Sequence, residues 1–251
     1  MAYQAGTLRL KGKLGDLSFY YNRQCGYLVR QKGGPDKKQI ASSPNFVRTR
    51  ENNAEFSLAA ATGKLIRQAV RAATGLKGDS YVSQRLNGLL VSIGKTDLSS
   101  ARGSRSPVIV FNEPDSRALL KSFAFYTTRP ITVAYSGHIN CDLAAGSIVL
   151  TSDTNETFAP ASEFFHAPKA ATHVQIKAAV AVLDFDNNSY KVYPAPVYIA
   201  KLENSMPPAD FACEVDTTDT HSRIGVMAIT FLQEKNGELY GLTEDVSLGI
   251  V

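Results

Sequence analysis

The sequence has no apolar run close to the about 18 residues that a membrane-spanning helix needs. Residues 1–15 also lack the basic, then apolar, then small-residue order of a secretory signal. We therefore expect no membrane segment and a cytoplasmic location. Only three cysteines are present, spread widely over the chain at Cys25, Cys141 and Cys213. This odd number argues against a disulfide framework and for free thiols in a reducing compartment.

Motifs of the common catalytic chemistries are missing as well. The chain has no Gly-x-Ser-x-Gly elbow of a serine hydrolase, no His-Glu-x-x-His of a zinc peptidase and no Gly-x-Gly-x-x-Gly of a dinucleotide site. No cysteine has an adjacent histidine. A site built from dispersed carboxylates would leave no such pattern. We expect a protein that is not an enzyme, with no cofactor, no resident metal and no small-molecule substrate.

Two partial motifs have simpler explanations. Gly94-Lys95-Thr96 resembles the end of a phosphate-binding loop, but Leu89 stands where that motif has its first glycine, so a helix C-terminus is favoured. Asp184, Asp186 and Asn188 resemble the first ligands of a helix-loop-helix calcium site. The glycine and glutamate that such a site needs later in the loop are absent, so a solvated hairpin tip is favoured.

A zinc site is a further alternative. His138-x-x-Cys141, together with Cys213 and His221, contains the two histidines and two cysteines of a tetrahedral centre. Only one pair is closely spaced, and the Cys-x-x-Cys or His-x-x-x-His spacings typical of zinc sites are absent. Ordinary core or strand residues are therefore the favoured interpretation, with a metal-dependent enzyme as the alternative.

Charge is divided unevenly along the chain. Residues 1–105 hold 18 Lys and Arg against 6 Asp and Glu, a balance of +12, whereas residues 106–251 hold 9 against 17, a balance of −8. The overall net charge of +4 conceals this division. It predicts two domains, a basic module over residues 1–105 and an acidic module over residues 106–251. We expect the basic module to touch something anionic.

The basic module is predicted to begin with a small β-meander. Residues 7–14 alternate between leucines on one side and mainly basic residues on the other, as in a half-buried strand. Further strands are expected over residues 17–21 and 27–30. Such a small sheet has too little core to stand alone. Residues 31–38 predict a flexible basic loop, because their glycines and proline oppose regular structure.

Two helices are expected next. Ser43-Pro44 predicts the N-cap and first residue of a long helix. A second helix is expected over residues 80–93, followed by a linker over residues 95–106. The apolar stripe that we expect on the long helix comprises Val47, Ala54, Leu58, Ala61, Leu65, Ala69 and Ala72.

The acidic module predicts an antiparallel β-sandwich, immunoglobulin-like in kind, because short β runs alternate with turn residues. Residues 173–184 alternate as a strand and turn at Asn187-Asn188. Residues 224–233 form another expected strand, and Asn236-Gly237 is the strongest hairpin signal in the chain. The predicted fold class is therefore α+β, a β-meander with two helices joined to a β-sandwich.

The candidate binding residues are cations interleaved with aromatic residues. Phosphate-neutralising charge next to aromatic faces is typical of nucleic-acid binding, but a solvated cationic face or a docking surface for an acidic protein has the same pattern. The aromatic residues are Phe19, Tyr20, Tyr21 and Tyr27. The cations expected to contact phosphate or carboxylate groups are Lys11, Lys13, Arg23, Arg30, Lys37, Lys38, Arg48 and Arg50.

Several short segments resemble those of a family of uncharacterised Bacteroidota proteins, and the opening is also similar to that of small phage and prophage proteins. The segments are Gly15-Asp16-Leu17-Ser18-Phe19-Tyr20, Gly26-Tyr27-Leu28-Val29-Arg30, Arg48-Thr49-Arg50-Glu51-Asn52, Ala171-Thr172-His173, Asp184-Phe185-Asp186 and Gln233-x-x-Asn236-Gly237-x-x-Tyr240. The resemblance implies a non-enzymatic structural or assembly protein of phage-like origin, in the cytoplasm or within a phage-like particle. Its expected partner is a protein or a second copy, with nucleic acid as the alternative and no membrane.

Overall fold

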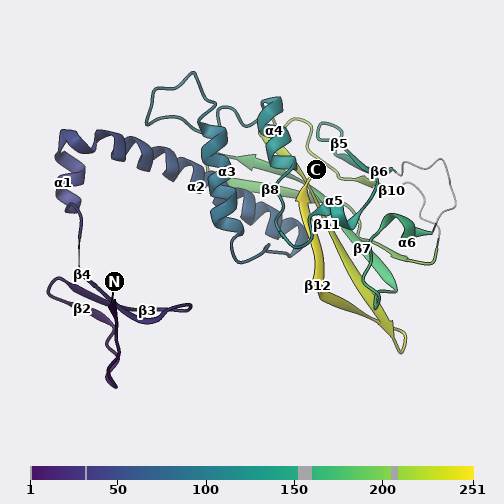
Figure 1. The fold of residues 1–251 in the computed structure, drawn as a ribbon. Coiled ribbons are helices and arrows are strands. Elements are labelled where there is room, and N and C mark those ends of the chain that lie inside the picture. The colour runs from purple at the N-terminus through teal and green to yellow at the C-terminus, as the bar shows by residue number, and fades with distance from the viewer. Residues whose placement is uncertain (1, 32, 152–159, 205–208) are drawn as a thin grey trace. The chain divides into compact units, whose positions relative to one another are not determined.

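The computed structural model of the chain describes residues 2–31, 33–151, 160–204 and 209–251. It contains helices and antiparallel sheets, which confirms the predicted α+β class. Two compact units are present, Met1–Arg50 and Glu51–Val251 (Figure 1). We call them unit 1 and unit 2.

Unit 1 opens with a four-stranded antiparallel sheet in the order β1-β4-β3-β2. Its first predicted strand, over residues 7–14, forms only at the last three residues, and the edge strand β1 was not expected. The side chain of Gln4 hydrogen-bonds the backbone of Leu10 instead, which holds the intervening segment outside the ladder. The strands are β1 Ala2–Tyr3, β2 Gly12–Leu14, β3 Leu17–Asn22 and β4 Gly26–Gln31.

Helices follow the sheet, and they correct two expectations. The predicted basic loop ends early, because Asp36 caps helix α1 (Lys37–Ser42) by accepting a hydrogen bond from the Lys37 amide. Ser43 and Pro44 are the N-cap and the first residue of a helical turn, as predicted, but the Ser43 side chain makes no capping hydrogen bond and the turn is a separate 3-10 element. The 3-10 turn η1 (Pro44–Phe46) comes next, and the long helix α2 then runs over Val47–Thr74.

Unit 2 is built on a five-stranded antiparallel sheet, in the order β12-β11-β7-β8 with β9 also paired to β7. Asn236 and Gly237 join β11 to β12 with positive φ angles of 55° and 81°, as the predicted two-residue hairpin requires. A smaller sheet has the order β10-β6-β5. The strands are β5 His138–Asp142, β6 Ser147–Thr151, β7 His173–Asp184, β8 Ser189–Pro194, β9 Tyr198–Lys201, β10 Ala209–Ala212, β11 Ser222–Lys235 and β12 Glu238–Ile250.

The five-stranded sheet lies between two cores. Val180 of β7 packs in a core shared with the small sheet, whereas the next residue, Ala181, packs in a core shared with helices, because successive strand residues point to opposite faces. The helices on that second face include α2, α3 (Val82–Gly94) and α4 (Pro114–Lys121). The short helices α5 (Ile131–Ala134) and α6 (Ala161–Phe164) belong to the first core.

This layering explains why the compact units do not divide where the charge does. The predicted boundary at residues 105 and 106 lies inside unit 2. Ile66 of α2 and Leu86 of α3 are fully buried in the same core as Val226 of β11, so the helices expected in the basic module pack on the sheet of the acidic one. The distribution of charged residues along the chain describes the surface of the protein. The division into compact units depends instead on which segments share an apolar core.

The two predicted helices form close to their expected ends, but the predicted stripe on α2 is partly wrong. Leu65 and Ala69 are buried as expected, whereas Ala54 and Leu58 are exposed. Burial starts at Ala59, because only the later part of α2 lies against α3 and the sheet. Within that part Ala61 and Ala72 of the predicted stripe are exposed, so the buried side of the helix is turned relative to the predicted one. No helix in the described part of the chain is long and apolar enough to cross a membrane.

The expected linker over residues 95–106 is organised by a buried carboxylate. Asp97 is fully buried, and its side chain accepts hydrogen bonds from the amides of Ser99, Ser100 and Ser106 and from the Ser99 hydroxyl. Hydrogen bonds from Ser100 and Ser99 hold the pKa of Asp97 well below its ordinary value. The segment is thus an ordered turn between α3 and α4.

Asp97→Asn is expected to destabilise the protein near neutral pH and to have a progressively smaller effect in acid. Since the pKa of Asp97 is lower in the folded than in the unfolded protein, its ionised form contributes stability above about pH 4, and this contribution disappears as the pH falls toward the folded pKa. Melting temperatures of both proteins from about pH 6 to about pH 2 test this. Asp186→Asn, in an exposed turn, is the control. A difference in melting temperature between Asp97→Asn and the original protein that stays the same at every pH would contradict the prediction.

Candidate functional site

Cationic side chains share one face of the unit 1 sheet. Antiparallel pairing places Ser18 of β3 opposite both Lys13 of β2 and Arg30 of β4, and directly paired residues point to the same face. Tyr20 lies two residues along β3 on this face, and the Arg30 guanidinium carbon lies 5.7 Å from the centre of its ring. Lys13 and Arg30 are both exposed. We call this surface the cationic face.

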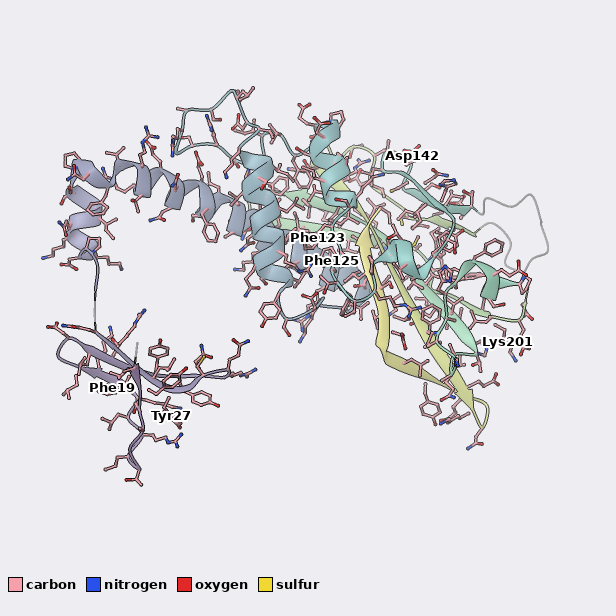
Figure 2. The ribbon with its side chains drawn as sticks, in the orientation of Figure 1. Phe19, Tyr27, Phe123, Phe125, Asp142 and Lys201 are labelled. Carbon is pink, nitrogen blue, oxygen red and sulfur yellow. The ribbon has the colours of Figure 1, made fainter. Side chains whose placement is uncertain are left out.

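The opposite face of the same sheet is aromatic. Tyr21 pairs with Tyr27 across β3 and β4, and their rings meet edge to face at 5.0 Å between centroids. Tyr27 is labelled on this sheet in Figure 2. The Lys11 ammonium lies 5.6 Å and 5.7 Å from the two ring centroids, and the Arg9 guanidinium carbon lies 5.1 Å from that of Tyr27. Each is a cation–π contact. Arg9 is absent from the predicted set, although its basic character in an alternating segment was a signal for it.

Unit 1 has almost no core of its own. Among its described residues only Leu28 is buried, at 5 % exposure. Tyr3 is 70 % exposed and Leu14 is 68 % exposed, and Leu17 and Tyr21 are also exposed. A sheet of this size with uncovered apolar side chains gains stability when a further surface covers it. These exposures match the expectation that the meander has too little core to stand alone.

The remaining predicted cations lie outside the strands. Arg50 is half-buried, and its guanidinium donates to the carbonyl oxygens of Ile40 at 2.8 Å and Ser43 at 2.9 Å, which joins α1 to α2. It therefore has a structural contact that the sequence did not indicate. Within the described residues, no carboxylate forms an ion pair with any of the eight predicted cations. The exposed cations of turn and helix positions are Arg23, Lys37, Lys38 and Arg48.

The thiols and histidines considered for zinc do not form a centre. No group of three or more His, Cys, Asp or Glu side chains in the described part of the chain is arranged to hold a metal. All three cysteines are free. Burial raises the pKa of Cys141 to about 11, so its thiol is protonated and weakly nucleophilic at neutral pH. His221 contacts Asp219 instead, with 2.6 Å between Nδ1 and Oδ1.

The two partial ligand motifs lie at ordinary structural positions. Asp184 ends β7 and accepts hydrogen bonds from the amides of Asp186 and Asn187, in the turn that leads to β8. Gly94 ends α3, and Lys95 is its C-terminal cap. Both positions agree with the simpler explanations given above. Of the surfaces that the sequence singled out, the cationic face and the aromatic face behind it combine exposed charge, exposed aromatic rings and a missing core.

Comparisons of the chain with known proteins found no relative. The predicted resemblance to Bacteroidota and phage proteins therefore stays a prediction. The chain matches no protein-family model, no curated protein and no solved structure.

Proposed function

We propose that the protein is a non-enzymatic structural or assembly protein whose unit 1 binds an acidic partner. The exposed cationic face, on a sheet with one buried residue, carries this proposal. Cations without ion-pair partners attract a surface of opposite charge. The uncovered apolar side chains of the same sheet supply the area that such a complex would bury.

A second copy of the chain is the partner that its charges favour. Residues 106–251 have a balance of −8, so each copy offers an acidic surface as well as the basic unit 1. Contacts of unit 1 on one copy with acidic residues of the next copy would link molecules head to tail, which builds rings or filaments. Such assembly would weaken as salt screens the charges.

The double variant Lys13→Glu/Arg30→Glu is expected to lose this self-association. Both side chains are exposed, so reversing them should leave the fold intact while it replaces attraction by repulsion on the cationic face. Sedimentation velocity at about 50 mM and about 500 mM NaCl measures the effect. The original chain should form assemblies that shrink at high salt, and the variant should stay small at both, with association at least about tenfold weaker.

The matched control reverses two charges elsewhere. Lys95→Glu/Lys121→Glu changes two exposed lysines of unit 2 and makes the same change in net charge. It should retain the assembly. If control and variant behave alike, or if the original chain stays monomeric at low salt and no acidic protein from its host binds it in a salt-sensitive way, the proposed function is wrong.

Nucleic-acid binding is a second candidate, favoured by the cations that lie over Tyr20, Tyr21 and Tyr27. An exposed sheet with charge beside aromatic rings is the arrangement on which single-stranded bases stack. Retardation of a mixed-sequence oligonucleotide at physiological salt, with release near about 0.5 M salt, would support it. An unchanged mobility at low salt would exclude it.

The finer expectations from the sequence belong to the same proposal. We propose an immunoglobulin-like kinship for the two packed sheets of unit 2, which share one core. A Bacteroidota or phage-like origin, and a place in the cytoplasm or in a phage-like particle, agree with an assembly role.

A further inference from the structure

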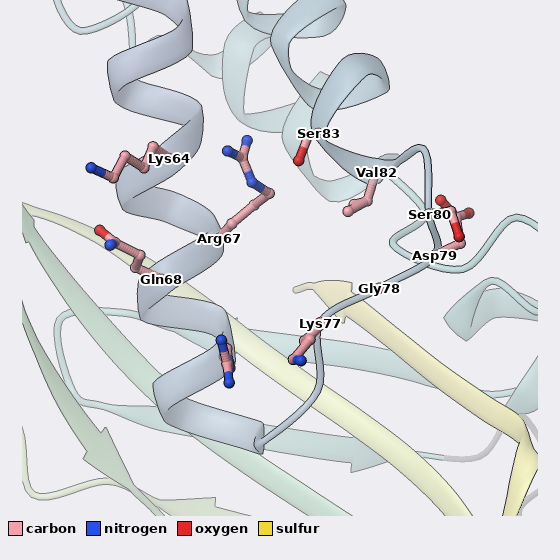
Figure 3. Close-up of a pocket in the computed structure, with 10 residues that line it drawn as sticks. Lys64, Arg67, Gln68, Lys77, Gly78, Asp79, Ser80, Val82 and Ser83 are labelled. Atoms are coloured by element: carbon pink, nitrogen blue, oxygen red, sulfur yellow. The ribbon is translucent and has the colours of Figure 1, made fainter. Parts of the chain in front are cut away.

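A cavity of about 440 Å³ lies in unit 2 between the last turns of α2 and the beginning of α3 (Figure 3). The loop that joins the two helices closes one side of it. In Figure 3 Arg67 extends from α2 toward α3, where Ser83 faces it. This volume lies in the range of small-molecule sites. No residue of the cavity belongs to unit 1, so it is independent of the cationic face.

Positive charge dominates the walls of this cavity. Lys64, Arg67 and Arg71 follow one another on α2 at intervals of three and four residues, which places them along one side of the helix. Lys77 adds a fourth cation from the loop. Within the described residues none of the four forms an ion pair with a carboxylate.

The one carboxylate among the residues that line the cavity already has a cationic partner. Asp79 forms an ion pair with Arg85 at 2.7 Å and accepts hydrogen bonds from the amide and hydroxyl of Thr127, each at 3.2 Å. Burial opposes its ionisation, but the bond to Arg85 and those from Thr127 and Tyr81 leave the pKa of Asp79 below its ordinary value. Asp79 therefore stays charged against Arg85 and leaves the four cations uncompensated.

The first turn of α3 adds donors on the same side. The N-cap residue Tyr81 makes no side-chain cap. The Val82 amide donates to the Asp79 carbonyl oxygen at 3.2 Å, whereas the next two amides of the first turn, those of Ser83 and Gln84, have no acceptor within the helix. The hydroxyl groups of Ser80 and Ser83 line the cavity beside them. Amide donors, the positive end of the helix dipole and two arginine forks together suit phosphate oxygens.

We propose that this cavity binds a small ligand that carries at least two phosphate groups. Lys64, Arg67, Arg71 and Lys77 all line this cavity, and a ligand with several negative charges would offset the repulsion between like charges. The planar guanidinium groups of Arg67 and Arg71 match two phosphoryl groups better than a single carboxylate. A long nucleic acid would need a groove that continues past the cavity, whereas the ten residues that line this open site all come from the stretch between Lys64 and Ser83.

Inorganic pyrophosphate is the probe, and isothermal titration calorimetry of the full chain is the measurement. Binding should saturate and weaken as NaCl rises. The double variant Arg71→Gln/Lys77→Gln removes two exposed cations, so folding should be unaffected, and affinity should fall roughly tenfold for each lost charge-assisted contact. Arg67→Gln should weaken binding as well; its circular dichroism and melting temperature show whether the helix pair is intact.

Two controls give the test its specificity. Lys95→Gln/Lys121→Gln removes the same charge from exposed positions, one of them at the opposite end of α3, and should bind pyrophosphate like the original chain. Lys13→Glu/Arg30→Glu should also bind it normally, which separates this site from the proposed function. No saturable heat at millimolar pyrophosphate would overturn the proposal. Equal losses in control and cavity variants, or saturable binding of a mixed-sequence oligonucleotide without binding of pyrophosphate, would overturn it too.

Discussion

Phe111→Ala is expected to lower the free energy of unfolding of unit 2 by about 3–5 kcal/mol, the usual loss when a buried phenylalanine is truncated. Phe111 is 0 % exposed. Its ring meets Phe185 edge to face at 5.0 Å, and the Arg117 guanidinium carbon lies 5.4 Å from its centroid. The loss would be a large fraction of the about 5–15 kcal/mol that stabilises a typical domain.

The effect should be specific to the core between helices and sheet. Ile109→Ala, two residues earlier in the chain and 54 % exposed, is the control and should change stability by less than about 0.5 kcal/mol. Urea unfolding monitored by circular dichroism measures both variants. Similar midpoints for the two would show that the packing of Phe111 contributes much less than its burial implies.

Removal of residues 1–50 is expected to abolish assembly while residues 51–251 keep their fold. Both apolar cores consist of unit 2 residues alone. The ion pair of Glu51 with Arg102, at 3.0 Å, also lies within the retained part. The melting temperature should therefore change by no more than a few degrees, whereas salt-sensitive association should disappear.

Calorimetry and sedimentation velocity of the truncated and full chains test this pair of results. Pyrophosphate binding should survive the truncation, because every residue that lines the cavity remains. An unfolded or insoluble 51–251 fragment would show that unit 1 supports the larger unit. A folded fragment that still assembles would place the contact surface outside unit 1.

Local features of the fold were the most predictable from the sequence. The Asn236-Gly237 hairpin follows from two adjacent residues that accept positive φ angles. Helix α3 follows from the spacing of its apolar residues, such as Leu86 and Leu90. Helix α1 was not predicted, because Gly33-Gly34-Pro35 indicated a loop over residues 31–38. Asp36 was nevertheless a signal for the N-cap of a helix.

The candidate sites were also predictable only in their local features. The concentration of cations and tyrosines in the first 30 residues is visible in the sequence, but the pairing of Lys13 and Arg30 across Ser18 depends on strand register. The cavity was not predicted at all. Arg67 and Arg71 lie three to four residues from other cations on one helix, but this spacing says nothing of the loop and the helix that form the rest of the cavity wall.

By itself the sequence determined the unequal charge of its two parts, the tight turns and the periodic helices, because each depends on residues that are near neighbours in the chain. Tertiary structure decided where the compact units divide, which side of α2 is buried and where four cations surround one cavity. These depend on contacts between distant segments, such as Ile66 with the core of β11, and such contacts leave no pattern in any one segment.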